Sequence, residues 1–229
     1  MILLAIDTSG KDGSIALARV AEEDSARRAN GVEIEILDQI PLEGGTFSAQ
    51  LVPQISGLLV KRGLGRTDLG AFAVASGPGS FTGLRVGLAA IKALAEVLGK
   101  PIAAVSRLEA IARAGKIRGR VLAALDAGRN EVYLGEYEVS QSLRMVHEKL
   151  VSQEEFLREA RAVKVVSPDL TVADTARRAG LDVVEVARPG SDAIARIGWE
   201  KITRGETISP EDLEANYIRR SDAEIFAKS

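Results

Sequence analysis

Two turns in the sequence carry side chains that suit magnesium or phosphate chemistry. Asp7-Thr8-Ser9-Gly10 follows the apolar run Ile2 to Ile6, and Asp126-Ala127-Gly128-Arg129-Asn130 follows the apolar run Val121 to Leu125. Carboxylates are ligands for hard cations, and hydroxyl groups donate hydrogen bonds to phosphate oxygens. The alternative is that both acids bond amides of their own turns, which is the commoner use of Asp at such positions.

A glycine-rich loop from Ser76 to Arg85 is a third candidate, because its glycines, hydroxyls and helix-start amides could cradle an anion. It lacks the Lys-Ser/Thr pair of a Walker loop and the spacing of a nucleophile elbow. The residues alone favour a simpler account, a tight strand-to-helix turn that uses Thr82 as the N-cap. The candidate anion or nucleotide contacts are Asp7, Thr8, Ser9, Gly77, Gly79, Ser80, Thr82 and Asp126.

Composition excludes several classes of site. The 229 residues include 30 basic and 32 acidic ones, and both halves of the chain are balanced, so neither half can grip a nucleic acid unaided. Aromatic residues make up only 4%, which argues against a base-stacking surface. Cysteine is absent and His147 is the only histidine, which excludes disulfides, Cys/His zinc cages and paired-histidine metal sites. His147 is interpreted as a surface residue in a connection between elements.

The N-terminus has no basic leader, and no apolar run approaches the ~18 residues of a membrane span. We therefore expect a cytoplasmic protein with no membrane contact. We also expect no metal site.

Apolar periodicity predicts alternating strands and helices. In the first half, strands are expected over 2–6, 14–19, 32–42, 71–75 and 102–105, and helices over 48–62 and 84–98. A solvated hairpin connection is expected over 21–31. Pro53 fits the first helix only if the regular helix begins near Leu51 or its first turn is kinked. In the second half, strands are expected over 121–125, 131–139, 163–166 and 183–186, and helices over 107–114, 152–160, 173–179, 192–204 and near 210–212.

The helix from Leu84 to Leu98 has two apolar faces and only a narrow polar stripe, so it must be covered on two sides. Either the helix that carries Leu51 to Leu59 covers the second face, or a partner protein does, with Gly87 and Ala90 permitting close approach. The residues alone favour neither alternative over the other.

The two halves repeat the same order of elements, which resembles the actin, sugar-kinase and heat-shock ATPase superfamily. The expected fold is α/β, with two actin-like (ribonuclease H-like) subdomains, each a mixed sheet with flanking helices. The subdomains are expected over 1–105 and 106–229, with the last segment folding back on the first. In an active member, Asp7 would lie near the metal, Thr8 and Ser9 would donate to the γ-phosphate, and Asp126 would orient water or a hydroxyl substrate.

A longer run, from Ala75 to Gly87, resembles the TsaB (YeaZ) family of tRNA threonylcarbamoyladenosine biosynthesis proteins. The resemblance extends to Ile6-Asp7-Thr8-Ser9, to Leu125-Asp126-Ala127 and to Tyr217-Ile218-Arg219. It covers essentially the whole chain, and it is strongest up to about residue 138. The sequence departs from the family pattern at Phe47, near Gly128 and at Ala215.

The resemblance implies a non-catalytic subunit that binds the catalytic subunit TsaD. With TsaE and ATP, that pair transfers a threonylcarbamoyl group to the adenosine beside the tRNA anticodon. The implied chain has no cofactor of its own, meets tRNA only through the complex, and can form a homodimer with the same surface. The implied partner interface is Leu51, Ile55, Leu58, Leu59, Leu84, Gly87, Leu88, Ala90, Ile91 and Leu94.

An active kinase or ATPase using Asp7 and Asp126 is the second reading, and it is disfavoured because the glycines of an adenosine pocket are missing. A hydrolase is the third, disfavoured by the single histidine.

Overall fold

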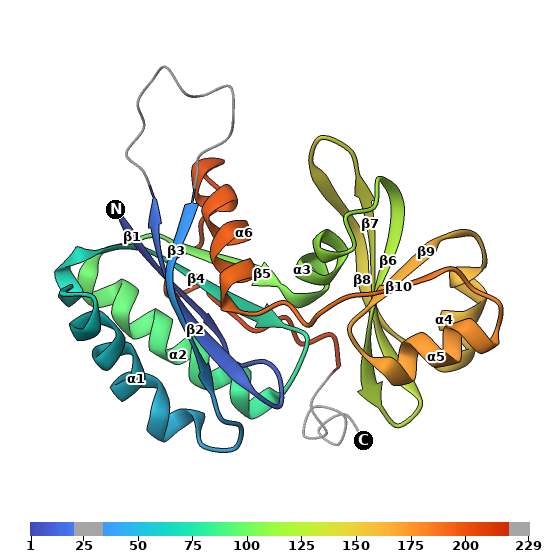
Figure 1. Cartoon of the computed structure of the whole chain (residues 1–229), viewed down its shortest axis with the longest axis horizontal. Coiled ribbons are helices and arrows are strands. Elements are labelled where there is room, and N and C mark those ends of the chain that lie inside the picture. Colours follow the sequence, from blue (N-terminus) through green and yellow to red (C-terminus); the bar gives the residue numbers. More distant parts are fainter. Residues whose placement is uncertain (21–33, 220–229) are drawn as a thin grey trace. The chain divides into compact units, whose positions relative to one another are not determined.

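The structure, a computed structural model, describes residues 1–20 and 34–219. The chain divides into two compact units, each with its own sheet and helices (Figure 1). The first unit comprises Met1–Val105 and Gly190–Ala215, and the second comprises Ser106–Pro189 and the residues from Asn216 onward. The stretch expected as one subdomain, 106–229, is therefore interrupted by a segment that packs with the first unit. The predicted connection over 21–31 and the end of the tail lie outside the described residues.

The first unit holds a five-stranded mixed sheet in the order β3-β2-β1-β4-β5. Strand β1 pairs antiparallel with β2 and parallel with β4. The elements are β1 (Ile2–Asp7), β2 (Gly13–Val20), β3 (Ile34–Leu42), α1 (Phe47–Lys61), η2 (Arg66–Asp68), β4 (Leu69–Gly77), α2 (Phe81–Leu98), β5 (Ile102–Ser106) and α6 (Ser191–Thr203).

Every residue of β1 is buried because helices cover both faces of this sheet. Leu4 and Ile6 belong to a core cluster that includes residues of α1 and α2. Helix α6 packs on the other face, as Figure 1 shows, and the Cα of Gly198 lies close enough to Ala73 that an added Cβ would be 2.4 Å from its Cβ. Burial on both faces explains why β1 and β4 are continuous apolar runs and not alternating ones.

The second unit holds another five-stranded mixed sheet, in the order β10-β9-β6-β7-β8. Two core clusters occupy its two faces: α4 and α5 contribute to one, and α3 contributes to the other. The elements are α3 (Arg107–Ala114), β6 (Gly119–Gly128), β7 (Glu131–Val139), β8 (Leu143–Ser152), α4 (Gln153–Glu159), η3 (Ala160–Ala162), β9 (Lys164–Ser167), α5 (Leu170–Arg178) and β10 (Val183–Glu185).

The fold class is confirmed, and most predicted elements are present. Two predictions were wrong. The connection expected around His147 is strand β8, an edge strand whose half-exposed residues lack the regular alternation that marks a strand. The helix expected near 210–212 is a turn, in which the Ser209 hydroxyl accepts a hydrogen bond from the Asp212 amide. Helix α1 begins at Phe47, within one residue of its predicted start and not near Leu51, and Pro53 lies inside it on its exposed side.

None of the helices in the described ranges combines the length and the apolar composition that a bilayer span requires.

Candidate functional site

The turn between β1 and β2 packs directly against the start of α2. The Thr8 hydroxyl donates a 2.7 Å hydrogen bond to the Gly83 carbonyl, and the Ser80 amide donates a 2.8 Å bond to the Ser9 carbonyl. The Asp7 carboxylate accepts the Ser9 amide at 2.9 Å and also the Ser9 hydroxyl. Asp7, Thr8 and Ser9 are all buried. These bonds fix the turn onto the helix that follows the glycine-rich loop.

Two glycines of α2 permit this contact. A Cβ at Gly83 would lie 2.0 Å from the Thr8 carbonyl oxygen, and one at Gly87 would lie 2.4 Å from the Thr8 hydroxyl oxygen. Both distances are far below van der Waals contact. A side chain at Gly83 would force the backbone of the turn away from the helix, and one at Gly87 would displace the Thr8 hydroxyl.

Helix α2 begins at Phe81, and its N-cap is Ser80, whose hydroxyl accepts a 3.3 Å hydrogen bond from the Gly83 amide. The predicted N-cap, Thr82, lies inside the first turn and is exposed, so that prediction was wrong by two positions. Gly77 has φ +118°, a conformation that favours glycine, and Gly79 is half-buried.

The hydrogen bonds of this loop bear on its predicted anion contacts. Thr8, Ser9 and Ser80 all form hydrogen bonds with other residues of the same turn and loop. The arrangement matches the simpler account of a tight strand-to-helix turn.

Asp126 lies in the second unit, at the end of β6, and is exposed. Its carboxylate accepts the Gly128 amide at 2.8 Å, and its own amide donates to Asp169 at 2.9 Å. Arg129 and Asn130 follow with φ of 56° and 59°, the left-handed pair of a two-residue hairpin turn. Asp126 thus bonds its own turn, as the simpler alternative expected. Across the described residues, no group of three or more His, Cys, Asp or Glu side chains is arranged to hold a metal ion.

The expected partner face divides between core and surface. Of its ten residues, only Ala90 and Leu94 are partly exposed. The other eight are buried in the first unit: Leu51, Ile55, Leu58, Leu59, Leu84, Gly87, Leu88 and Ile91. The periodicity correctly identified apolar faces, but these eight residues are buried within the first unit itself.

A different face of α1 and α2 is open. Helix α1 has no charged residue from Phe47 to Val60, although that stretch exposes Val52 (65%) and Val60 (74%). Helix α2 lies beside α1 (Figure 1) and exposes Val97 (78%). We call this the α1/α2 face, and we define it by the exposed small or apolar residues Ala49, Val52, Pro53, Ser56, Gly57, Val60, Ala89, Ala93 and Val97. Small uncharged residues at helical spacing permit another helix to approach closely.

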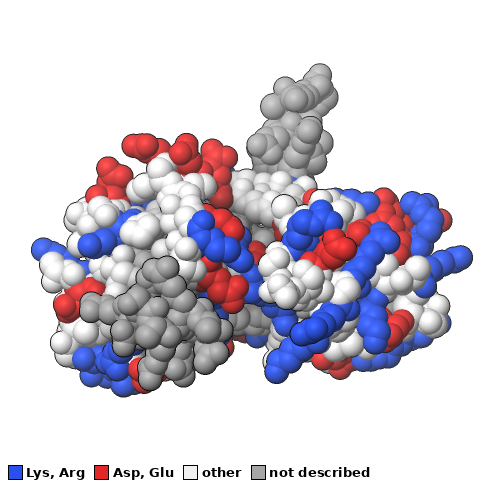
Figure 2. All heavy atoms as spheres, turned by 90° about the horizontal axis from the view of Figure 1, so that it is seen from above, with Lys and Arg blue, Asp and Glu red and all other residues white. Residues whose placement is uncertain are grey.

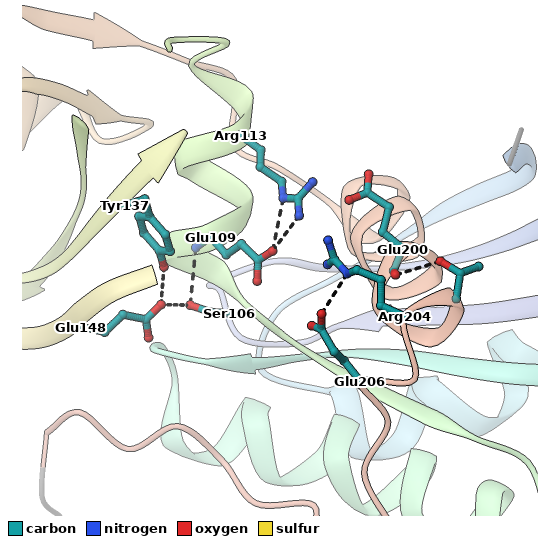
Figure 3. A network of polar contacts seen from close by, with 9 residues as sticks. Ser106, Glu109, Arg113, Tyr137, Glu148, Glu200, Arg204 and Glu206 are labelled. Atoms are coloured by element: carbon teal, nitrogen blue, oxygen red, sulfur yellow. Dashed lines mark hydrogen bonds and ion pairs between the residues drawn. The ribbon is translucent and has the colours of Figure 1, made fainter. Parts of the chain in front are cut away.

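Sequence reasoning missed a polar network in the second unit. The Glu148 carboxylate accepts hydrogen bonds from the hydroxyls of Ser106 and Tyr137 (Figure 3) and a 2.6 Å bond from the Asn216 side-chain amide. Burial, followed by the charge of Glu148, raises the pKa of Tyr137 well above its usual value. Ser106 also caps α3 through the amides of Leu108 and Glu109. The spacing Ser106-x-x-Glu109 was the available signal, because it is a helix-start pattern.

Ion pairs brace both units. Arg120 forms a bidentate pair with Glu136, with nitrogen-to-oxygen distances of 2.5 and 3.1 Å, and this pairing lowers the pKa of Glu136. In the first unit, Lys61 lies 2.7 Å from Asp38, and the two together with Arg62 link the end of α1 to β3. Lys61 and Arg62 hold the pKa of Asp38 below its ordinary value. A separate pair, Arg204 with Glu206 at 2.8 Å, closes the end of α6 (Figure 3).

Comparison with known proteins places this arrangement in a family. The model of the family described as "TsaD: tRNA N6-adenosine threonylcarbamoyltransferase" matches residues 44–195. The tRNA threonylcarbamoyladenosine biosynthesis protein TsaB of Escherichia coli is 30% identical over 237 residues, covering 97% of this chain and 96% of that protein. TsaB of Bacillus subtilis is 37% identical over 144 residues, covering 62% of this chain and 58% of that protein.

Solved structures agree with the sequence comparison. A crystal structure of a protein similar to peptidase YeaZ, from Pseudomonas aeruginosa, matches with a TM-score of 0.73 and 27% identity, covering 95% of this chain and 99% of that chain. YeaZ from the same organism matches with a TM-score of 0.71 and 24% identity, covering 94% and 99%.

Proposed function

The chain belongs to the TsaB (YeaZ) family, whose members take part in the biosynthesis of tRNA threonylcarbamoyladenosine, and from this we propose that it acts as the non-catalytic partner that binds and activates TsaD. In this proposal TsaD carries the transferase chemistry, and TsaE and ATP serve the complex. This chain holds no cofactor of its own and contributes a docking surface.

The observation that carries the proposal is the α1/α2 face. An ordinary solvent-facing helix carries charged residues on its outer side, whereas α1 exposes Val52, Pro53 and Val60 and has no charge before Lys61. Burying exposed apolar area stabilises a complex by about 25 cal/mol per Å² before the costs of association. A pair of helices on TsaD could cover this face as a bundle.

The first unit's hydrogen bonds support the non-catalytic part of the proposal. Thr8 and Ser9, the donors that an ATPase would direct at a γ-phosphate, bond Gly83 and Asp7. Arg129 occupies the second turn where a small residue would admit a phosphate, and it has φ of 56°.

The test is to mix the purified chain with its cognate TsaD and weigh the complex by native mass spectrometry. Val97→Glu should weaken the heterodimer about a hundredfold, because a buried unpaired charge costs about 3 kcal/mol or more. Thr171→Glu is the matched control: it adds the same charge at an exposed position in the first turn of α5, where a carboxylate suits the helix dipole. If the Val97→Glu variant still forms the heterodimer fully and supports tRNA modification, the α1/α2 face is not the surface that binds TsaD.

A further inference from the structure

Cationic residues gather at one end of the sheet of the second unit, because of the way its elements run. Strands β6 and β9 are parallel, with Val121 opposite Lys164, so both begin at the same end. Helices α4 and α5 connect strand ends to the next strand starts, so both finish at that end. We call it the basic end, and its cationic residues are Lys116, Arg118, Arg120, Arg144, Arg158, Arg161, Lys164, Arg177 and Arg178.

The other end of the same sheet carries both signs of charge. Asp126 and Glu131 flank Arg129 in the turn between β6 and β7, and Asp169 and Glu131 form ion pairs with Arg188 and Arg219. Figure 2 looks onto the molecule from the side where β6 begins, and blue side chains gather over the second unit, at the right of the view.

Only some of the basic end is neutralised within the chain. Arg120 pairs with Glu136, Arg144 with Glu138, Lys164 with Asp182, and Arg177 with Asp174 and Glu185. The remaining five cations are exposed and make no ion pair with any described residue: Lys116, Arg118, Arg158, Arg161 and Arg178.

Helix dipoles explain part of this arrangement. Arg158 and Arg178 lie in the last turns of α4 and α5, where a cation is favoured. Arg118 lies between α3 and β6, outside any helix, and gains nothing from a dipole. Five exposed like charges at one end also repel one another, and an external polyanion would turn that repulsion into attraction.

We propose that the basic end binds the phosphate backbone of tRNA in the assembled complex. The proposal rests on the proposed function, which supplies the RNA. Arg118 and Arg161 each stand three residues before the register pair Val121 and Lys164, so both residues lie at the end of the sheet where the neighbouring strands β6 and β9 begin. Long exposed cations of this kind contact phosphates without reading sequence, and they orient an RNA that another subunit recognises.

The test is a pair of charge-reversed double variants in the complex with TsaD. Arg118→Glu with Arg161→Glu removes two cations of the basic end. Arg66→Glu with Lys100→Glu is the matched control, since both residues are exposed, belong to the first unit and make no ion pair with described residues. Unfolding temperature and heterodimer mass are measured first, and then binding of an unmodified tRNA transcript is measured from 50 to 200 mM salt.

The basic-end variant should weaken tRNA binding at least tenfold and reduce the slope of log affinity against log salt by about 2, one for each lost phosphate contact. The control should change the affinity less than threefold. If the basic-end variant unfolds, Arg118→Gln with Arg161→Gln replaces it and should show the same slope change.

Two outcomes overturn the proposal. One is an intact complex with unchanged tRNA affinity and unchanged salt slope. The other is loss of the heterodimer by a folded basic-end variant, which would make the basic end a protein contact. Failure of the unaltered chain to bind TsaD, seen before any tRNA is added, contradicts the proposed function instead.

Discussion

Thr8 and Gly83, 75 positions apart in the sequence, are joined by a 2.7 Å hydrogen bond from the Thr8 hydroxyl to the Gly83 carbonyl. The bond crosses the point where an actin-like ATPase would present a turn and a helix start to phosphate. Gly83 lacks a side chain, so the Thr8 backbone can lie against the helix. This contact packs the turn between β1 and β2 tightly against the first turn of α2.

Gly83→Ala should destabilise the protein by about 1 to 3 kcal/mol. The new Cβ would meet the Thr8 carbonyl oxygen at 2.0 Å, and a backbone atom cannot turn aside as a flexible side chain can. Urea unfolding followed by circular dichroism measures the change.

Gly57→Ala is the control for that experiment. Gly57 lies inside α1 with open space where its Cβ would point, so alanine should stabilise the protein by up to about 1 kcal/mol. Equal stability of the two variants would contradict the close packing at Gly83.

Gly87→Glu and Ala93→Glu should distinguish a buried position of α2 from an exposed one. Gly87 is buried against Thr8, so the glutamate should prevent folding, whereas Ala93 is exposed and its variant should fold normally and lose TsaD binding. Thermal unfolding and native mass spectrometry report the two effects. A folded Gly87→Glu protein with unaltered unfolding temperature would show that the turn does not pack on α2 as described.

The sequence predicted the fold well where a residue pattern was compatible with only one kind of element. Continuous apolar runs marked β1 and β4, which are buried on both faces, and helical spacing marked α1, α2 and α6. Strand β8 was not predicted, because an edge strand is paired on one side only and this one mixes exposed Met145 and Val146 with charged residues.

The candidate site was harder to predict, since periodicity shows that a helix face is apolar and not what covers it. Leu51 and Leu88 have the same apolar character as Val52 and Val97, yet the first two are buried and the last two are exposed. The gathering of cations in the second unit was also hidden, because Arg118 and Arg161 lie at the same end of the sheet only through the parallel register of β6 and β9.

The isolated protein should bind tRNA only weakly and without sequence preference. Its net charge of −2 opposes a polyanion, and the five cations of the basic end that make no ion pair with described residues supply non-specific contacts alone. Fluorescence anisotropy at physiological salt should give a dissociation constant weaker than about 1 μM. A tighter, sequence-dependent constant would show that the chain recognises tRNA without a partner.

The purified protein should neither hydrolyse ATP nor transfer its phosphate, because Asp7 and Thr8 are engaged in hydrogen bonds of the turn. Phosphate release is measured before and after a final purification step. Activity that persists through purification and disappears in Asp7→Asn would contradict the non-catalytic proposal.

The pair of Arg120 and Glu136 should make stability depend on pH in the acid range. Arg120 lowers the pKa of Glu136, and His147 and Lys149 act in the same direction. A carboxyl whose pKa is lower in the folded state stabilises the protein above its unfolded pKa, about 4.3, and this stabilisation is lost as pH falls through the folded pKa. The free energy of unfolding should therefore decrease on going from pH 6 to pH 3.

Arg120→Gln tests that coupling. At pH 7 it should lower the free energy of unfolding, because the mostly buried Glu136 loses both of its hydrogen bonds to the guanidinium. Below pH 4 the gap between the variant and the original protein should narrow, since a protonated Glu136 no longer depends on the cation. Urea unfolding of both proteins at pH 3, 4, 5 and 7 measures the gap directly. A difference that stays constant across this range would mean that the pair contributes packing of the Arg120 chain and no charge-dependent stability.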